Sequence, residues 1–172
     1  MVLRPVDDEV LELLLDVAVK QAEPGEVMPP VEGPPGWTRD RMDAFRDFHR
    51  SRYGGLEGAQ RTVMFAIIVD GSVVGMIRMS LLDQPGMMET GMWLGQPHRG
   101  RGIGGTALQA LLGKAGAVGA HTVIAKTTPG NAAALGVLRR RGAVLTEERD
   151  TIRASIDVPP SPLISPIMTW RS

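Results

Sequence analysis

The stretch Gln96-Pro-His-Arg-Gly-Arg-Gly-Ile-Gly-Gly-Thr106 lies between an apolar run, Met92-Trp93-Leu94, and a segment that we expect to form a helix, residues 107–117. Its four glycines leave backbone N–H groups uncovered by side chains, and the start of a helix adds aligned peptide dipoles. Two arginines add positive charge at the same place. The stretch therefore suits a diphosphate group, and its candidate ligand-binding residues are Arg99, Gly100, Arg101, Gly102, Ile103, Gly104, Gly105 and Thr106.

Two simpler interpretations of this stretch stay open. It can be a glycine-rich surface turn without a ligand, and Gly100-x-Gly102-x-x-Gly105 also satisfies the pattern of dinucleotide-binding folds. The dinucleotide interpretation is weak, because the polar residues 96–99 separate the apolar run from the first glycine. The acidic residue expected about 20 positions further on is also missing from the segment at residues 121–126.

A third interpretation rests on Arg99-x-x-Gly102-x-Gly104, which resembles the acetyl-CoA pyrophosphate loop of the GNAT superfamily of N-acetyltransferases. The segment at residues 131–143 resembles the second signature of that family, a helix that begins at Asn and ends at Gly. The resemblance covers about residues 62–145 and implies acetyl-CoA (coenzyme A) as the cofactor. It adds further candidate cofactor-binding residues on one face of the second helix, namely Asn131, Ala134 and Leu138.

Length and composition predict one globular domain over residues 1–172. The chain is 43% hydrophobic and 22% charged, and 19 basic residues balance 19 acidic residues, so neither nucleic acid nor a membrane is an expected partner. No apolar stretch reaches the roughly 18 residues of a transmembrane helix. Cysteine is absent, which excludes disulfides and thiolate catalysis and fits a reducing cytoplasm. The three histidines lack the spacing of metal ligands, so no metal site is expected.

The order of the expected elements predicts a mixed α/β sheet. Helices are expected from Asp7 or Asp8 to about residue 20 and from Thr38 to about residue 52. Asp70-Gly71 predicts a hairpin turn between two strands. The expected strands cover residues 2–4, 61–69, 72–80, 88–94 and 122–127, with two more within 143–158.

The family resemblance implies a central sheet that is mixed, mostly antiparallel and flanked by helices. Within the single domain, residues 2–90 are expected to hold the N-terminal helices and the hairpin, with an acceptor loop at residues 21–37. Residues 91–145 are expected to form the acetyl-CoA-binding core. A proline-rich tail is expected over residues 159–172.

Glu89 is the candidate catalytic base. Acetyl transfer needs a base, because an alkyl amine with a pKa of about 10.4 is mostly protonated at pH 7. Glu89 begins the strand before the glycine-rich stretch, where an acid resembles the base of many family members; it can equally be a solvated carboxylate. The resemblance also implies that a backbone N–H near Trp93 or Leu94 polarises the thioester carbonyl, and Trp93 can be a core residue at the same time.

The proton donor departs from the family pattern. Many family members carry Tyr seven residues after the Asn, where it protonates the leaving thiolate, and here this position is Leu138. The only tyrosine, Tyr53, is therefore the candidate acid, with water as the alternative. The step can also proceed without an acid, because a thiol with a pKa near 8.5 is a tolerable leaving group.

The resemblance implies an acceptor site built partly from the segment between the first two helices. Prolines stiffen residues 23–37, and the candidate acceptor-binding residues are Glu26, Trp37, Tyr53 and Glu89. Carboxylates beside an aromatic face suit a cation such as an amino sugar, although the segment can also be an ordinary acidic surface loop. Glu26-Val-Met-Pro-Pro30 resembles aminoglycoside N-acetyltransferases that act on kasugamycin-type amino sugars.

The sequence therefore predicts a cytoplasmic enzyme that moves the acetyl group of acetyl-CoA to a primary amine. The expected acceptor is a small cation, an aminoglycoside-type antibiotic that acetylation would inactivate. Two alternatives stay open: a protein N-terminal α-amine acetyltransferase of the ribosomal-protein type, and a non-catalytic acyl-CoA-binding module. A homodimer is compatible with the sequence.

Overall fold

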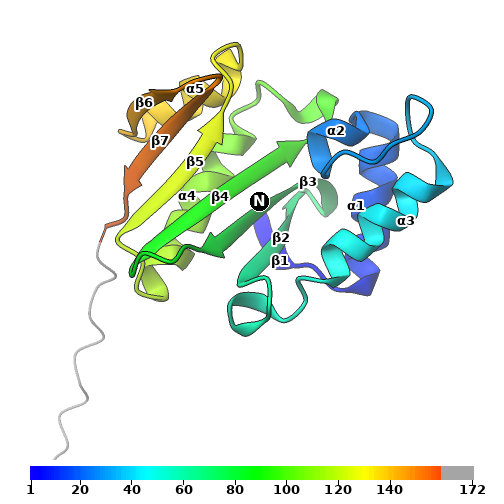
Figure 1. The fold of residues 1–172 in the computed structure, drawn as a ribbon, viewed down its shortest axis with the longest axis horizontal. Helices are drawn as coiled ribbons and strands as arrows, with labels where there is room; N and C mark the ends of the chain where they lie inside the picture. Colours follow the sequence, from blue (N-terminus) through cyan, green and yellow to red (C-terminus); the bar gives the residue numbers. More distant parts are fainter. Residues whose placement is uncertain (160–172) are drawn as a thin grey trace, which may run out of the picture.

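A seven-stranded sheet forms the centre of the computed structural model, which describes residues 1–159 (Figure 1). The strand order is β1-β2-β3-β4-β5-β7-β6, and every neighbouring pair is antiparallel except β4 and β5. The expected mixed, mostly antiparallel sheet is confirmed. The strands are β1 (Val2–Pro5), β2 (Thr62–Val69), β3 (Ser72–Leu81), β4 (Met87–Leu94), β5 (Thr122–Thr127), β6 (Val144–Glu148) and β7 (Thr151–Asp157).

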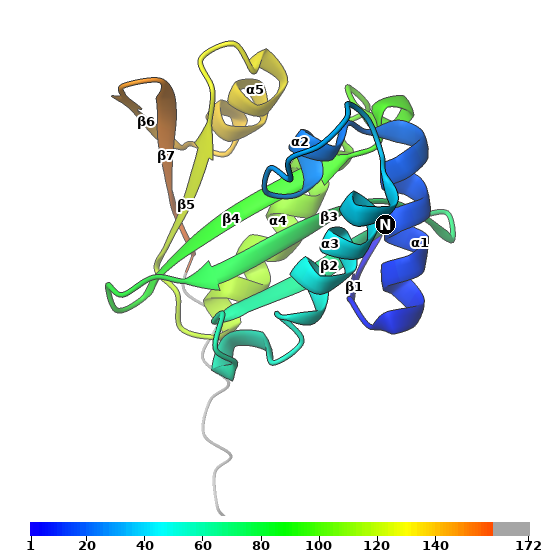
Figure 2. The same ribbon diagram turned by 45° about the vertical axis from the view of Figure 1, so that its right-hand side comes forward.

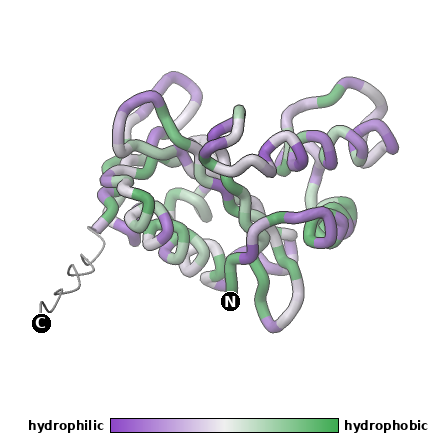
Figure 3. Tube along the Cα trace, turned by 90° about the horizontal axis from the view of Figure 1, so that it is seen from below, coloured by the Kyte–Doolittle hydropathy of each residue, from purple (hydrophilic) through white to green (hydrophobic). Residues whose placement is uncertain are grey.

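Helices cover both faces of the sheet (Figures 1 and 2). On one side, here called the α3 face, α1 (Asp8–Gln21) and α3 (Arg39–Arg50) bury Leu14 and Phe45 with Trp93 of the sheet. On the other side, the α4 face, α4 (Ile103–Ala117) buries Leu111 with Ile77. Figure 3 shows hydrophilic residues along the outer helices and loops, with hydrophobic segments between them. The remaining helical segments are α2 (Pro24–Val27), η1 (Gly55–Glu57), η2 (Gln96–His98) and α5 (Ala132–Arg140).

Local signals place the ends of these elements. Asp7, rather than Asp8, caps α1, because its side chain accepts a hydrogen bond from the Val10 N–H at 2.9 Å. Thr38 caps α3 as predicted, and positive φ angles at residues 70 and 71 form the predicted turn between β2 and β3. The α3 helix ends at Arg50, before the expected residue 52, because the next backbone bonds are tighter i→i−3 bonds.

One helix was not predicted from the sequence. The α2 helix lies inside the proline-rich segment that was expected to be a loop. Pro24 takes its first position, where a missing N–H costs nothing, and the Glu26 carboxylate accepts a hydrogen bond from the Glu23 backbone N–H at 3.0 Å. Among the described helices of residues 1–159, none combines the length and the hydropathy that crossing a membrane requires.

The predicted tail falls almost wholly on residues 160–172, outside the part of the chain that the structure describes.

Candidate functional site

Strands β4 and β5 pair over only half of β4, and they diverge towards its C-terminal end (Figure 2). The pairing runs from Met87–Thr122 to Thr90–Ala125, so residues 91–94 have no β5 neighbour. The backbone bond from the Gly95 N–H to the Val74 carbonyl fixes which β4 groups face β3. By the two-residue alternation of a strand, residues 93 and 91 also face β3, whereas 92 and 94 face the diverging side.

The register thus separates the two residues that the sequence analysis considered for polarising a carbonyl. The Leu94 N–H faces the diverging side, and so does that of Met92, which was not among the predicted residues. The backbone N–H of Trp93 faces β3, and the Trp93 side chain is 6% exposed within the α3-face cluster. Its contribution in this structure is to packing.

The glycine-rich loop leads from β4 into the first turn of α4. Gly100 and Gly102 have φ angles of 71° and 79°, in the left-handed region that favours glycine, and Gly102 is the N-cap of α4. The first intrahelical bond runs from the Thr106 N–H to the Gly102 carbonyl, so the N–H groups of residues 103–105 precede the helical ladder. Gly104 lets α4 approach β4, because a Cβ there would lie 3.1 Å from the Met92 Cε. These N–H groups form the cradle for an anion that the sequence predicts.

Arg99 and Glu26 form a bidentate ion pair that joins the glycine-rich loop to α2. Both Arg99 Nη atoms donate to the Glu26 carboxylate at 3.1 Å, and Arg99 Nε donates to the Leu94 carbonyl at 2.9 Å. The Arg99 guanidinium lowers the pKa of the Glu26 carboxyl. The two residues were predicted to bind different ligands, the cofactor and the acceptor, and the structure brings them together because α2 lies at the C-terminal end of β4 (Figure 1).

The Asn-led helix docks beside α4. The Asn131 side chain accepts a hydrogen bond from the Ala134 N–H at 3.1 Å and caps α5, and Leu138 is buried in the α4-face cluster. Arg141 donates to the Gly105 carbonyl at 2.9 Å and thereby holds the end of α5 against the first turn of α4. Ile103 packs against the same cluster, whereas Arg101 is exposed.

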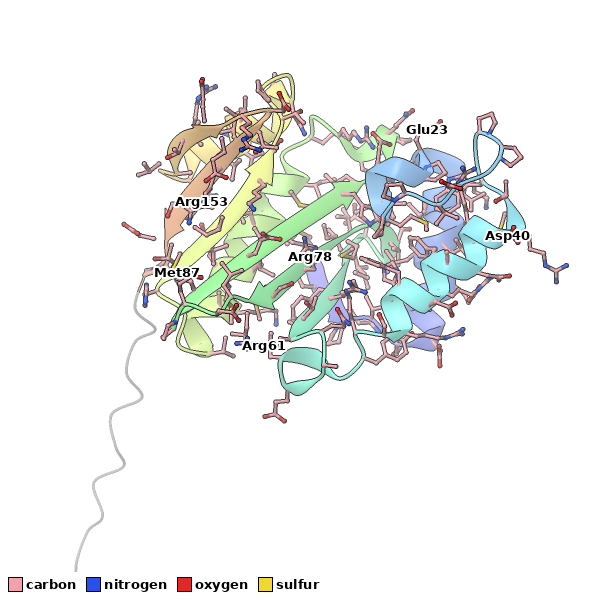
Figure 4. All side chains as sticks on the ribbon, in the orientation of Figure 1. Glu23, Asp40, Arg61, Arg78, Met87 and Arg153 are labelled. Atoms are coloured by element: carbon pink, nitrogen blue, oxygen red, sulfur yellow. The ribbon has the colours of Figure 1, made fainter. Side chains whose placement is uncertain are left out.

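Glu89 lies on the α3 face in a polar row that crosses three strands. Across the sheet, Thr62 of β2 is the register partner of Ser80 of β3, and Ser80 is the register partner of Glu89 of β4. The Thr62 and Ser80 hydroxyls are 2.7 Å apart. Arg78 lies one position along the same face, donates to Ser80 at 3.0 Å and forms an ion pair with Glu89 at 3.1 Å. Figure 4 shows Arg78 on the sheet face between β4 and α3.

A cavity of about 430 Å³ opens above Thr62, Ser80 and Arg78 of this row, and Glu89 adjoins it through its ion pair with Arg78. Its apolar wall includes Phe48, and its polar lining residues are Glu26, Arg52, Thr62, Arg78 and Ser80. Of the predicted acceptor-binding residues, Glu26 therefore lies at the cavity. Neither arginine was predicted as a site residue from the sequence. A signal for Arg78 existed, since it is the only charged residue in the strand Ser72–Leu81, which is otherwise apolar apart from a serine near each end. No comparable signal marked Arg52, which follows α3.

The structure does not bring Tyr53 to Glu89. The Tyr53 hydroxyl donates to the Asp8 carboxylate at 3.3 Å, and its neighbours Pro5 and Val6 belong to the β1 side of the sheet. Partial burial and the Asp8 carboxylate raise the pKa of Tyr53. With β2 and β3 lying between β1 and β4, the phenol is not a neighbour of the base.

Trp37 has a structural position too. Its indole N–H donates to the Ala22 carbonyl at 2.9 Å, and its ring packs edge-on against Phe45 with centroids 5.9 Å apart. These contacts tie the proline-rich segment to α1 and α3. The free aromatic face that was expected beside the acceptor is used here for packing.

The family model for the acetyltransferase (GNAT) domain matches residues 1–144, which is most of the chain. The chain belongs to the GNAT acetyltransferase family. This confirms the family to which the glycine-rich loop and the Asn-led helix pointed. Enzymes of this family take their acetyl group from acetyl-CoA, so the expected enzyme class and cofactor are confirmed at the level of the family.

Curated relatives of this GNAT chain match over a short segment. L-methionine sulfoximine/L-methionine sulfone acetyltransferases of Pseudomonas aeruginosa and Pseudomonas paraeruginosa are 40% identical over 57 residues. The match spans about a third of this chain and 33% of those relatives.

Solved structures share the fold over nearly the whole chain. Mycobacterium smegmatis RimJ, in complex with a CoA disulfide, has a TM-score of 0.74 and 22% identity, with 92% of this chain and 84% of that one covered. RimL, a ribosomal L7/L12 α-N-protein acetyltransferase in complex with coenzyme A, has a TM-score of 0.73 and 17% identity, with 91% and 93% covered. At these identities the likeness establishes the fold of this GNAT domain.

Proposed function

We propose that this protein transfers the acetyl group of acetyl-CoA to a primary amine held in the cavity on the α3 face. The observation that carries the proposal is the position of Glu89. It pairs with Arg78 and is the register partner of Ser80, both of which line the cavity, and it lies on the strand whose C-terminal half has a free edge. An amine in the cavity and a cofactor along that edge would therefore meet beside one carboxylate.

The cofactor cradle supports acetyl-CoA. The N–H groups of residues 103–105 and the left-handed Gly102 suit a diphosphate. The N–H groups of Met92 and Leu94 on the free edge are available to the pantetheine arm and to the thioester oxygen. Acetyl-CoA, when bound, supplies the activated acyl carbon that the amine attacks.

Glu89 serves as the general base. Its side chain is 26% exposed, so water reaches it, and Arg78 holds the carboxylate towards β3 at 3.1 Å. A carboxylate in this position removes a proton from the bound ammonium, directly or through one water molecule. Since Tyr53 bonds to Asp8 instead, we propose that the departing thiolate takes its proton from solvent or from the protonated base.

The acceptor class is the finer part of the proposal. The contacts of Glu26 and Trp37 do not favour the polycationic aminoglycoside that the proline-rich segment suggested, because Arg99 neutralises Glu26 and the indole is packed. Among similar proteins, the spermidine N-acetyltransferase of Vibrio cholerae is named for a polyamine. Two others are named for the amine of methionine sulfoximine and the N-terminal amine of a ribosomal protein. Both are α-amines.

An acceptor screen tests the proposal. The protein would be mixed with acetyl-CoA and with L-amino acids, short peptides, polyamines and aminoglycosides, and thiol release would be followed at pH 7.5. We expect turnover with at least one amine class and a rate lower by about 10²-fold or more with E89Q at the same acceptor concentration. Acetyl-CoA binding by calorimetry without turnover on any amine would overturn catalysis and favour the acyl-CoA-binding module.

A further inference from the structure

Two guanidinium groups, those of Arg52 and Arg78, and one carboxylate, that of Glu26, line the cavity. The Glu26 carboxylate is already paired with Arg99. Arg78 is paired with Glu89. Arg52 has no ion-pair partner among residues 1–159, and its bonds go from one nitrogen, Nη1, to the Phe48 carbonyl at 2.6 Å and the Ser51 hydroxyl at 2.9 Å. Burial and the nearby Arg78 cation lower the pKa of Arg52. The cavity wall therefore carries uncompensated positive charge.

The Arg52 guanidinium is held in place by its surroundings. Its carbon lies 3.8 Å from the centre of the Phe48 ring, a cation–π contact that fixes the plane of the group. The donors of Nε and Nη2 remain for a ligand. A half-buried guanidinium that is oriented but unpaired is costly to keep, and a bound anion offsets that cost through charge-assisted, often bidentate, hydrogen bonds.

Arg78 places the anion site next to the base. The same guanidinium donates to Ser80 and to Glu89, so the anion site and the carboxylate base adjoin each other. A ligand that uses both would carry an anionic group and an amine a few bonds apart. The apolar part of the wall, Met28, Pro29 and Phe48, leaves room for an apolar side chain.

We propose that Arg52, with Arg78, binds the carboxylate of the acceptor, and that the acceptor is a free α-amino acid or a close analogue. This inference rests on the proposed function. An α-amino acid carries its amine and carboxylate on one carbon, as the adjoining sites require. A peptide N-terminus lacks the α-carboxylate, and an aminoglycoside would place further cations against two arginines.

The reaction is balanced without another reactant. The amine nitrogen forms a bond to the thioester carbonyl carbon, and the carbon–sulfur bond breaks. Glu89 accepts the proton lost by the nitrogen, and that proton leaves to the thiolate or to solvent. The N-acetyl amino acid has lost its cationic group but keeps its carboxylate.

The test compares an acid with its uncharged amide. Each of the 20 standard L-amino acids and its amide would be assayed with acetyl-CoA, and kcat and KM would be measured for the best pair. We expect kcat/KM at least tenfold higher for the acid. In R52Q, the KM for the acid should rise at least tenfold, while the KM for the amide and for acetyl-CoA stay within twofold.

Two variants control this experiment. R50Q removes an arginine two residues away that pairs with Asp8 outside the cavity, and it should keep the preference for the acid. R52K keeps the charge but not the bidentate fork and should lie between the wild type and R52Q. Thermal melting of all variants separates misfolding from lost recognition.

The outcomes distinguish the proposed carboxylate site from the proposed acetyl transfer. Turnover of amides, peptides or amino sugars in preference to acids, or an unchanged preference in folded R52Q, would overturn the carboxylate site and leave acetyl transfer standing. Absence of turnover with every amine, with acetyl-CoA still bound, would overturn the proposed function and this inference with it.

Discussion

The proposed cofactor cradle and the proposed acceptor cavity would hold their ligands by different means. The cradle consists of backbone N–H groups at the start of α4 and on the free edge of β4. The cavity is lined by residues of α2, α3, β2 and β3 and of the segments after α2 and α3, with arginines and hydroxyls on one wall and Phe48 on another. Backbone groups suit a cofactor shared by a whole family, whereas side chains can change with the acceptor. Substitutions in the two regions should therefore separate into effects on acetyl-CoA and effects on the acceptor.

The largest expected effect comes from Glu89, where the two regions meet. E89Q keeps the shape of the side chain but removes the proton acceptor, so kcat should fall about 10²-fold or more at pH 7. The loss should shrink towards pH 10, where the free amine becomes abundant. Steady-state kinetics at saturating acceptor from pH 6 to 10 would measure this. Near-full activity of E89Q at pH 7 would show that another group is the base.

His49 should make the acceptor side of the fold sensitive to acid. Its ring is fully buried, Nδ1 bonds to the Phe45 carbonyl at 2.8 Å, and burial lowers the pKa of His49 to about 4. The folded state thus binds this proton less readily than the unfolded chain, whose pKa is about 6.5. The stabilisation is complete above pH 6.5 and is lost as the pH falls towards 4, by about 2 kcal/mol at pH 5.

Urea unfolding at pH 7.5 and pH 5 would check this loss. H49F removes the titrating ring, so its own change between the two pH values should be smaller than that of the wild type by about the same 2 kcal/mol. Equal changes in both proteins would mean that carboxylates, not His49, determine the acid sensitivity.

A substitution at Gly102 should affect the cofactor cradle and leave the acceptor cavity unchanged. An alanine in its left-handed conformation costs about 1–2 kcal/mol and would displace the first N–H groups of α4, so the KM for acetyl-CoA should rise about tenfold in G102A. Gly113, inside the same helix, has open space where a Cβ would be. G113A should leave both KM values within twofold. If G102A raised the KM for the acceptor but not the KM for acetyl-CoA, the division between cradle and cavity would be contradicted.

The smallest effect is expected from the pair that joins the two regions. Arg99 and Glu26 side chains are 39% and 40% exposed, so their coupling in a double-mutant cycle of E26Q and R99Q should be about 0.5–1 kcal/mol in unfolding free energy. The coupling should fall in 1 M salt. An additive cycle would mean that this ion pair contributes nothing measurable.

The fold was predictable wherever a short segment carries its own signal. Asp7, Thr38 and the turn at residues 70 and 71 act within a few residues, and the glycine-rich loop has its motif in consecutive positions. The α2 helix was missed because proline was taken as a loop signal, although Pro at the first helical position followed by Glu favours a helix start.

The acceptor side was predictable only in part. Glu89 could be named from its place before the loop, but its neighbours depend on strand register and on the folding of α3 over the sheet. Arg52 and Arg78 are 26 positions apart in the sequence and meet only in three dimensions. Glu26 and Arg99 are 73 positions apart, so their pairing was equally invisible.

The packing at Gly91 links the residue types that positions 78 and 91 can hold in homologues. The Arg78 guanidinium lies across β4 at Gly91, where a Cβ would come within 3.1 Å of its Nε. A larger residue at position 91 would push the arginine away from the Glu89 carboxylate. Homologues that keep an arginine at position 78 are therefore expected to keep glycine at 91, and those that lose one should be free to lose the other.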